Sequence, residues 1–152
     1  MRFVFLCFFA LFTIAAQPAG AKSGSPMHTI SVQTAKGSQT WQIELASDAE
    51  SRAKGLMFRK QMDADKGMLF RFEQTRPIAM WMKNTFISLD MIFIREDGTI
   101  ARIESNTTPE SEEIVGSGEP VRYVLEINAG QAEEKGLKPG MLFRHPWFVT
   151  SN

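Results

Sequence analysis

The sequence predicts a compact, mainly β domain, built as an antiparallel sandwich or barrel with one or two short helices. Short stretches in which apolar and polar residues alternate with a period of two recur along the chain, which is the pattern of strands with one buried face. Turn-forming Gly, Pro, Asn and Asp residues separate these stretches. Only two segments carry helix signals. Together, these observations favour a sheet-based core over a helical bundle.

A hairpin is predicted at the start of the domain. Polar residues alternate with His28, Ile30 and Val32 and then with Trp41, Ile43 and Leu45, and Lys36-Gly37-Ser38 between the two stretches suits a turn. The two stretches should therefore pair with one face buried.

Two short helices are predicted. Ser47 and Glu50 form a capping box, in which the hydroxyl and the carboxylate bond free amides of the first turn, so a helix should cover about residues 48–54. Asn128 is placed to cap a second helix that runs through Lys135.

The remaining strands are predicted from the same alternation. They cover residues 68–72, 78–83, 89–94, 99–104, 121–128 and 141–143. The stretch 89–94 is apolar on both faces except for Asp90, which indicates a central strand. The stretch 121–128 has the most regular alternation and predicts a half-buried strand. Turns at Asp97-Gly98 and Pro139-Gly140 lead into two of these strands.

The connection over residues 106–120 is long and rich in Pro, Gly, Ser and Glu. Loops longer than about 12 residues are uncommon in compact domains unless they serve a site or are disordered. Two interpretations are open, a lid or rim of a site and a solvated acidic loop.

The N-terminus has the features of an export signal. Arg2 precedes an uncharged apolar run, Phe3 to Ala16, and Ala19-Gly20-Ala21 fits the small residues before a cleavage site. The run is shorter than the roughly 20 residues that a transmembrane helix needs. We expect a periplasmic or secreted protein, with an uncleaved membrane anchor as the alternative. The predicted organisation is a signal peptide over 1–21, a tether over 22–27 and a single β-rich domain over 28–148.

Composition narrows the possible functions. Cys7 is the only cysteine and lies within the predicted signal, so the mature chain should have no disulfide, thiolate nucleophile or zinc-thiolate site. The chain has 17 basic and 17 acidic residues, and loss of Arg2 with the signal changes the formal net charge from 0 to −1. The basic residues are scattered along the chain. We therefore expect neither a nucleic-acid partner nor an anionic membrane surface as partner. The short apolar run predicts no stable membrane span after cleavage.

The stretch WMKNTFISLDMIF, residues 81–93, places polar side chains in an apolar run. If its start is extended, Trp81, Lys83 and Thr85 share one face, and an indole, an ammonium and a hydroxyl together suit a small-molecule site. The alternative is that Asn84-Thr85 is a turn and that Lys83 extends its ammonium into water.

Two carboxylates are further candidates. Asp90 shares a strand face with apolar residues, and an unpaired buried carboxylate costs several kcal/mol. Its expected partner is Lys83, Arg59 or a backbone amide, and its role is a structural pair, a general base or a ligand contact. The simplest interpretation of Glu126 is a solvated strand position, although it is also a candidate acid or base. The candidate ligand-binding residues are Arg59, Trp81, Lys83, Asn84, Thr85, Asp90 and Glu126.

No metal or cofactor site is predicted. Asp63 to Gly67 has two carboxylates of a calcium loop but lacks the other ligands. His28 and His145 lie near opposite ends of the predicted mature chain and have no motif around them, so a catalytic triad or a histidine metal site has weak support. Gly116-Ser117-Gly118 lacks the spacing of a nucleophile elbow, and the chain has no glycine-rich phosphate loop.

Four sequence blocks resemble the family called domain of unknown function 192. They are KGLMFRKQM, GMLFRF, WMKNTFISLDMIF and YVLEINAG, followed by a glycine-containing turn, and the resemblance covers about residues 41–143. It implies a mainly β sandwich of jelly-roll type, commonly behind an export signal, and no established reaction. Ser88 stands where the family often has Pro, and Gly140-Met141 stands where it often has Gly-Asp, which removes an acidic residue.

Three classes of function remain open. The first is an exported, non-enzymatic binding module whose small ligand or envelope partner contacts Trp81, Lys83 and Asn84. The second is a hydrolase-type enzyme with Asp90 or Glu126 as acid or base. The third is a structural partner of an envelope protein, acting through an apolar surface. A pocket with convergent polar groups favours the first two, a carboxylate of raised pKa facing it favours the enzyme, and a flat apolar patch favours the third.

Overall fold

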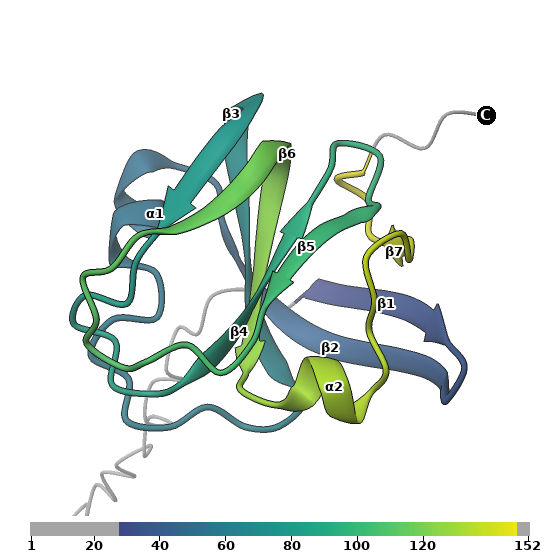
Figure 1. Ribbon diagram of the computed structural model, residues 1–152, viewed down its shortest axis with the longest axis horizontal. Helices are drawn as coiled ribbons and strands as arrows, with labels where there is room; N and C mark the ends of the chain where they lie inside the picture. Colours follow the sequence, from purple (N-terminus) through teal and green to yellow (C-terminus); the bar gives the residue numbers. More distant parts are fainter. Residues whose placement is uncertain (1–27, 149–152) are drawn as a thin grey trace, which may run out of the picture.

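Within residues 28–148, seven strands form one curled sheet that carries two short helices (Figure 1). The computed structural model describes residues 28–148, so the predicted signal peptide and tether lie outside the described residues. The strands are β1 (His28–Thr34), β2 (Gly37–Ala46), β3 (Lys66–Met80), β4 (Leu89–Ile94), β5 (Ile100–Glu104), β6 (Val115–Asn128) and β7 (Phe143–Arg144). The helices are α1 (Ala49–Lys54) and α2 (Gln131–Glu134).

The strand order is β5-β4-β6-β3-β2-β1-β7. Neighbouring strands are antiparallel except β2 and β3, which are parallel because α1 and the loop after it carry the chain back along the sheet. Thr99 and Leu142 form a bridge between the two ends of the sheet, and the amide of Ile100 donates to the carbonyl of Met141 at 2.8 Å. The sheet thus curls into a half-barrel. The predicted fold class is confirmed, with one parallel pair that the prediction missed.

The sheet has an apolar cluster on each face. One cluster, the inner core, is built around Trp41, Ile92 and Leu125. The other, the outer core, includes Leu56 and Met82, which come from outside the strands and cover the second face. β4 is therefore buried on both faces, which explains its continuous apolar run. β4 is an inner strand as predicted, but the prediction that β6 is half-buried was wrong.

β3 is one long strand where the alternation predicted two. Its register against β6 shifts on either side of Pro77, which lies opposite Pro120, and neither proline has an N–H to donate. The amide of Ile78 donates instead to the hydroxyl of Ser117 at 3.0 Å. These irregularities bend the strand without ending it.

Both helices begin at residues other than the predicted caps. The carboxylate of Asp48, rather than the hydroxyl of Ser47, accepts from the amide of Ser51 at 2.8 Å and caps α1. Aspartate and serine are similarly good caps, so their adjacency left the choice open. α2 begins after Gly130, which has no side chain to cap the helix, and Asn128 donates to two carbonyl groups in the loop before β3.

The acidic connection before β6 is shorter than predicted. β6 begins at Val115, so only residues 105–114 are irregular. The amide of Glu110 donates to the carbonyl of Thr85 at 3.0 Å, which ties this loop to the segment after β3.

Candidate functional site

A pocket of about 280 Å³ opens between α1, the end of β3 and the turn after β3. Its apolar wall is formed by Leu56, Met57, Phe70, Phe72, Met80 and Trp81. Among the described residues that line it, Glu126 of β6 is the only acid. We call this hollow the Glu126 pocket. An apolar cavity with one convergent polar group is the usual form of a small-molecule site.

Glu126 lies on the face of β6 that belongs to the outer core. Its neighbours across the ladder are Met68 on β3 and Met91 on β4, both buried. Glu126 is 4% exposed, its carboxyl group makes no hydrogen bond or ion pair with residues 28–148, and burial raises its pKa to about 8. The prediction of a solvated strand position was wrong, because the outer core covers this face of the sheet.

The predicted common face of Trp81, Lys83 and Thr85 is not formed, because β3 ends before Trp81. The amide of Thr85 donates to the carbonyl of Met82 at 3.0 Å, and Asn84 has a φ of 55° at the third position of this turn. Asparagine adopts left-handed backbone more readily than most residues. The alternative prediction, a turn at Asn84-Thr85, is therefore correct.

The turn divides the predicted site residues into two groups. Trp81, which is 45% exposed, and Thr85 line the Glu126 pocket, whereas Lys83 and Asn84 do not. The ammonium of Lys83 lies 5.2 Å from the centre of the Trp81 ring and 3.3 Å from the carboxylate of Glu112. Lys83 thus holds Trp81 from outside the pocket.

Replacing Lys83 by alanine is expected to lower the melting temperature by less than about 5 °C, because exposed ion pairs and cation–π contacts each contribute about 1 kcal/mol or less. Differential scanning fluorimetry measures this, with Lys60→Ala at another exposed lysine as the control. A loss beyond about 10 °C would contradict the peripheral position of Lys83.

Asp90 is completely buried, and its partners are backbone amides. One carboxylate oxygen accepts from the amides of Asn106 at 2.9 Å and Gly130 at 3.0 Å, and the other accepts from the amide of Ala132 at 2.8 Å. Three partners were expected for Asp90. The prediction of a backbone amide is correct, and the prediction of Lys83 is wrong. Asp90 thus joins β4 to the loop after β5 and to the first turn of α2. It does not line the Glu126 pocket.

Arg59 also lies apart from Glu126. Its guanidinium donates to both carboxylate oxygens of Glu44, at 2.6 and 2.8 Å, and this pairing holds the pKa of Glu44 below its usual value. The pair lines a separate hollow beside α1. Arg59 is therefore neither the partner of Asp90 nor a residue of the Glu126 pocket.

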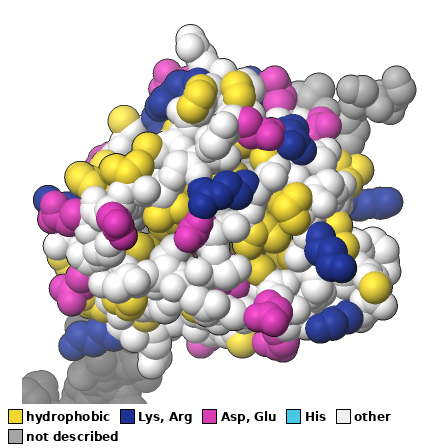
Figure 2. Space-filling view, in the orientation of Figure 1, with side chains coloured by type: hydrophobic (Ala, Val, Ile, Leu, Met, Phe, Trp, Pro, Cys, Tyr) yellow, Lys and Arg dark blue, Asp and Glu magenta, His cyan; other side chains and the backbone are white. Residues whose placement is uncertain are grey.

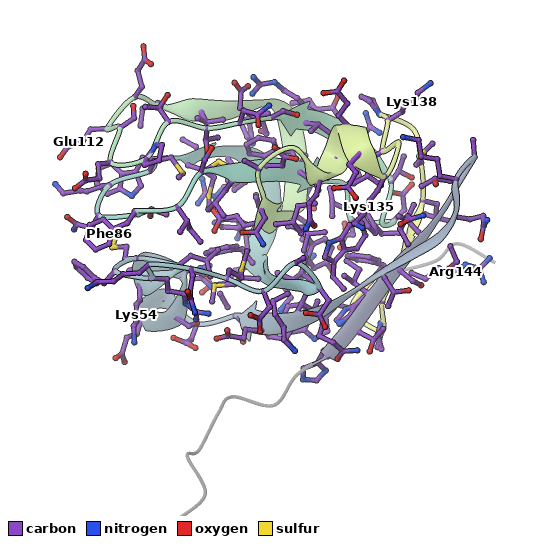
Figure 3. All side chains as sticks on the ribbon, turned by 90° about the horizontal axis from the view of Figure 1, so that it is seen from below. Lys54, Phe86, Glu112, Lys135, Lys138 and Arg144 are labelled. Carbon is purple, nitrogen blue, oxygen red and sulfur yellow. The ribbon has the colours of Figure 1, made fainter. Side chains whose placement is uncertain are left out.

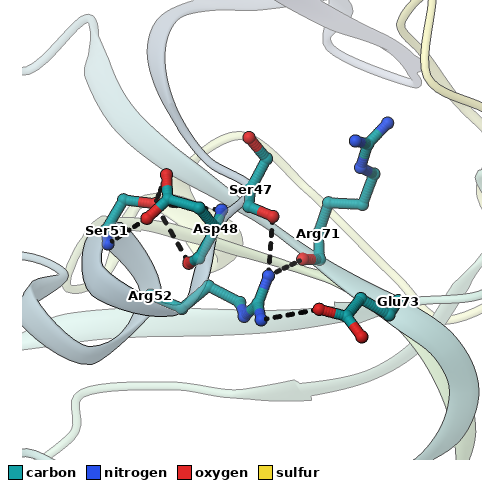
Figure 4. A network of polar contacts seen from close by, with 6 residues as sticks. All are labelled: Ser47, Asp48, Ser51, Arg52, Arg71 and Glu73. Atoms are coloured by element: carbon teal, nitrogen blue, oxygen red, sulfur yellow. Dashed lines mark hydrogen bonds and ion pairs between the residues drawn. The ribbon is translucent and has the colours of Figure 1, made fainter.

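Arg52 of α1 forms part of the pocket wall and is fixed by its own contacts (Figure 4). Its guanidinium donates to the carbonyls of Ser47 at 2.7 Å and Arg71 at 3.1 Å, and it lies 3.6 Å from the carboxylate of Glu73. These contacts attach α1 to β3. The wall of the pocket is thus held in place, and the charge of Arg52 is already compensated.

Exposed aromatic side chains lie near the pocket, and the sequence analysis missed them. Phe58 is 61% exposed, Phe86 is 42% exposed, and their ring centres are 6.1 Å apart. Phe58 has a φ of 64°, an unusual conformation for a bulky residue. Phe86 lies at the same end of the molecule as Lys54 and Glu112 (Figure 3). On the face shown in Figure 2, acidic and basic side chains are interspersed without a large area of one sign.

The two histidines are close in space although they are far apart in the sequence. The ring centres of His28 and His145 are 6.2 Å apart, and burial together with the neighbouring His28 lowers the pKa of His145. Across residues 28–148, no three His, Cys, Asp or Glu side chains gather closely enough to hold a metal ion. Within the same range, no helix is long and apolar enough to cross a membrane.

Comparison with known families classifies the fold that carries this pocket. The model of the DUF192 family, described as "Uncharacterized ACR", matches residues 30–145. The chain belongs to the DUF192 family. The resemblance of its four sequence blocks is thereby confirmed.

Two solved structures are similar to this DUF192 chain. A protein of Sinorhizobium meliloti 1021, described as a candidate transcription regulator, is 46% identical, with a TM-score of 0.77 over 82% of this chain and 97% of that chain. A protein of unknown function from Novosphingobium aromaticivorans DSM 12444 is 34% identical, with a TM-score of 0.78 over 86% of this chain and 94% of that chain. No curated protein matches the sequence. The absence of a nucleic-acid partner, expected from the scattered charge, stays a prediction.

Proposed function

We propose that this DUF192 domain is a binding module for a small, largely apolar molecule that occupies the Glu126 pocket. The observation that carries the proposal is a buried carboxyl group without a protein partner, facing a cavity lined by aromatic and thioether side chains. Burying a polar group without a hydrogen bond costs free energy, and a ligand atom that bonds Glu126 recovers it. The proposal keeps Trp81 and Thr85 as ligand-facing residues and replaces Lys83 and Asn84 by Glu126.

The proposal is tested by closing the pocket from α1. Ala53 lines the pocket and Ala49, one turn earlier, does not, while both are exposed. In a thermal-shift screen of small apolar metabolites, compounds that stabilise the wild-type protein should lose their effect on Ala53→Phe and keep it on Ala49→Phe. Equal responses of the two variants would place the ligand elsewhere.

A second candidate function is acid–base catalysis of a hydrolytic reaction by Glu126. It is favoured by the pKa of about 8, because a general acid or base works best when its pKa is near the working pH. Asp90 is no longer a candidate for this role, because both of its carboxylate oxygens accept hydrogen bonds from backbone amides. Turnover of chromogenic esters or glycosides by the wild-type protein, lost in Glu126→Gln, would support the enzyme. Binding without turnover supports the binding module.

We also propose that the domain acts outside the cytoplasm, on the basis of the apolar run and the small residues that precede Lys22. Expression of the full chain in a bacterial host should yield a protein that begins at Lys22 and leaves the cells with the periplasmic fraction. Intact-mass spectrometry checks the cleavage. Recovery of residues 1–21 on the membrane-bound protein would support the uncleaved anchor instead.

A further inference from the structure

We infer that the Glu126 pocket selects a neutral ligand, with an apolar ring or chain and one hydrogen-bond acceptor such as a carbonyl oxygen, to which the Glu126 carboxyl group donates. The inference rests on the proposed function, because it names the chemical class of the molecule that the pocket binds. Three features of the pocket carry it.

The first feature is the isolation of the Glu126 carboxyl group from positive charge. Burial is the only cause of its raised pKa, so Arg52 and Lys54, the two cations in the pocket lining, do not stabilise an ionised form. Met68 and Met91 flank the residue along the sheet. Near neutral pH, the group is thus mainly a neutral carboxylic acid, which carries an O–H donor.

The second feature is the positive charge already placed on the aromatic walls. The ammonium of Lys83 lies 5.2 Å from the Trp81 ring centre, and the guanidinium groups of Arg52 and Arg76 each lie 5.8 Å from the Phe72 ring centre. Aromatic rings attract cations, and protein cations already lie over both of these rings. A cationic ligand would compete with these groups for the rings, whereas a neutral ligand would not.

The third feature is the size of the pocket and the flexibility of the side chains that line it. A cavity of about 150 Å³ suffices to hold benzene, so a pocket of about 280 Å³ accepts a six-membered ring with a short substituent. The thioether side chains of Met57 and Met80 line the pocket and adapt to different shapes. The polar atom of such a ligand finds its donor in Glu126.

Three probes that share a benzene ring and a two-carbon substituent separate the chemical classes. Acetophenone carries a carbonyl acceptor, ethylbenzene carries no polar group, and 1-phenylethylamine carries a cation near neutral pH. Binding is followed in the protein labelled with ¹³C at the methionine methyl groups, because Met57 and Met80 report from the pocket wall. Dissociation constants are measured at pH 6, 7 and 9.

Acetophenone should bind more tightly than both other probes, with a dissociation constant that changes little from pH 6 to 7 and rises about tenfold from pH 7 to 9. This follows because the binding-competent, protonated fraction falls about tenfold across the pKa of about 8. Glu126→Gln keeps an N–H donor and should bind acetophenone without pH dependence. Glu126→Leu should not distinguish acetophenone from ethylbenzene. The methyl spectra of both variants without ligand show whether the fold is kept.

Each contrary result has a defined meaning. Tighter binding of 1-phenylethylamine, lost in Glu126→Gln, overturns the neutral class and leaves the proposed binding function standing. Equal, pH-independent binding of acetophenone and ethylbenzene also overturns the inference alone. If no probe shifts the Met57 and Met80 signals and the metabolite screen is empty, both the inference and the proposed function fail.

Discussion

Replacing Asp90 by asparagine is expected to lower the melting temperature by about 10 °C or more. The carboxylate accepts hydrogen bonds from three buried or partly buried amides. Asparagine keeps only one acceptor oxygen and turns an NH₂ donor toward the remaining N–H. Losing charge-assisted bonds and leaving an amide unpaired costs about 3 kcal/mol or more. For a domain of this size, about 1 kcal/mol shifts the melting temperature by roughly 3 to 6 °C.

The matched control for this prediction is Asp63→Asn, at an exposed position in the loop before β3. It should change the melting temperature by no more than about 2 °C, because exposed substitutions usually have small effects. Scanning calorimetry of the three proteins makes the comparison. If Asp90→Asn melts within a few degrees of the wild-type protein, Asp90 is not the structural anchor of β4 and α2.

Replacing Glu126 by glutamine should change how stability depends on pH. The folded protein holds a proton on Glu126 up to about pH 8, whereas the unfolded chain releases it near the usual glutamate pKa of 4.5. A carboxyl group with a raised folded pKa contributes its full stability below pH 4.5 and loses it as the pH rises toward 8. The difference between wild type and Glu126→Gln should therefore shift in favour of the variant by on the order of 4 kcal/mol between pH 4.5 and 8.

Urea unfolding of both proteins at pH 4.5, 6 and 8 measures this shift, because other titrating groups cancel in the difference. Glu133→Gln, at an exposed position on α2, is the control and should show no pH-dependent difference. A constant difference between wild type and Glu126→Gln across the range would show that Glu126 is ionised in the folded protein.

Local patterns in the sequence predicted the local structure well. Gly37 and Gly98 have positive φ angles in the two predicted hairpin turns, because glycine adopts this backbone without steric cost. α1 covers Ala49–Lys54 within the predicted range, and Gly55 after it also has positive φ. These features depend on neighbouring residues, which one sequence contains in full.

The candidate site was harder to predict because it depends on which segments cover the outer face of the sheet. Period-two alternation in β6 indicated one buried face, and nothing in that stretch showed that Leu56 and Met82 cover the other. The available signal was in β4, whose apolar run already required both faces to be buried. Pairing that strand with β6 would have moved Glu126 from solvent to the core.

The extended structure predicted for residues 81–85 did not form, and the reason is local. Continued alternation through Lys83 competed with the turn preference of Asn84, and the turn prevailed. Only Trp81 and Thr85 reached the pocket as a result. Asp90 was correctly expected to have a partner, but the amides that bind it come from residues 16 to 42 positions further along the chain. Such distant contacts have no pattern in a single sequence.

Titration of the Glu126 carboxyl carbon by ¹³C NMR, in the free protein and with saturating acetophenone, tests most directly whether Glu126 is a buried neutral acid that donates to a ligand. We expect a midpoint near pH 8 in the free protein and a higher midpoint with acetophenone, since the ligand bonds the protonated form. A midpoint near the usual glutamate pKa of 4.5, unchanged by acetophenone, would contradict both the buried neutral acid and its proposed role as donor to a ligand.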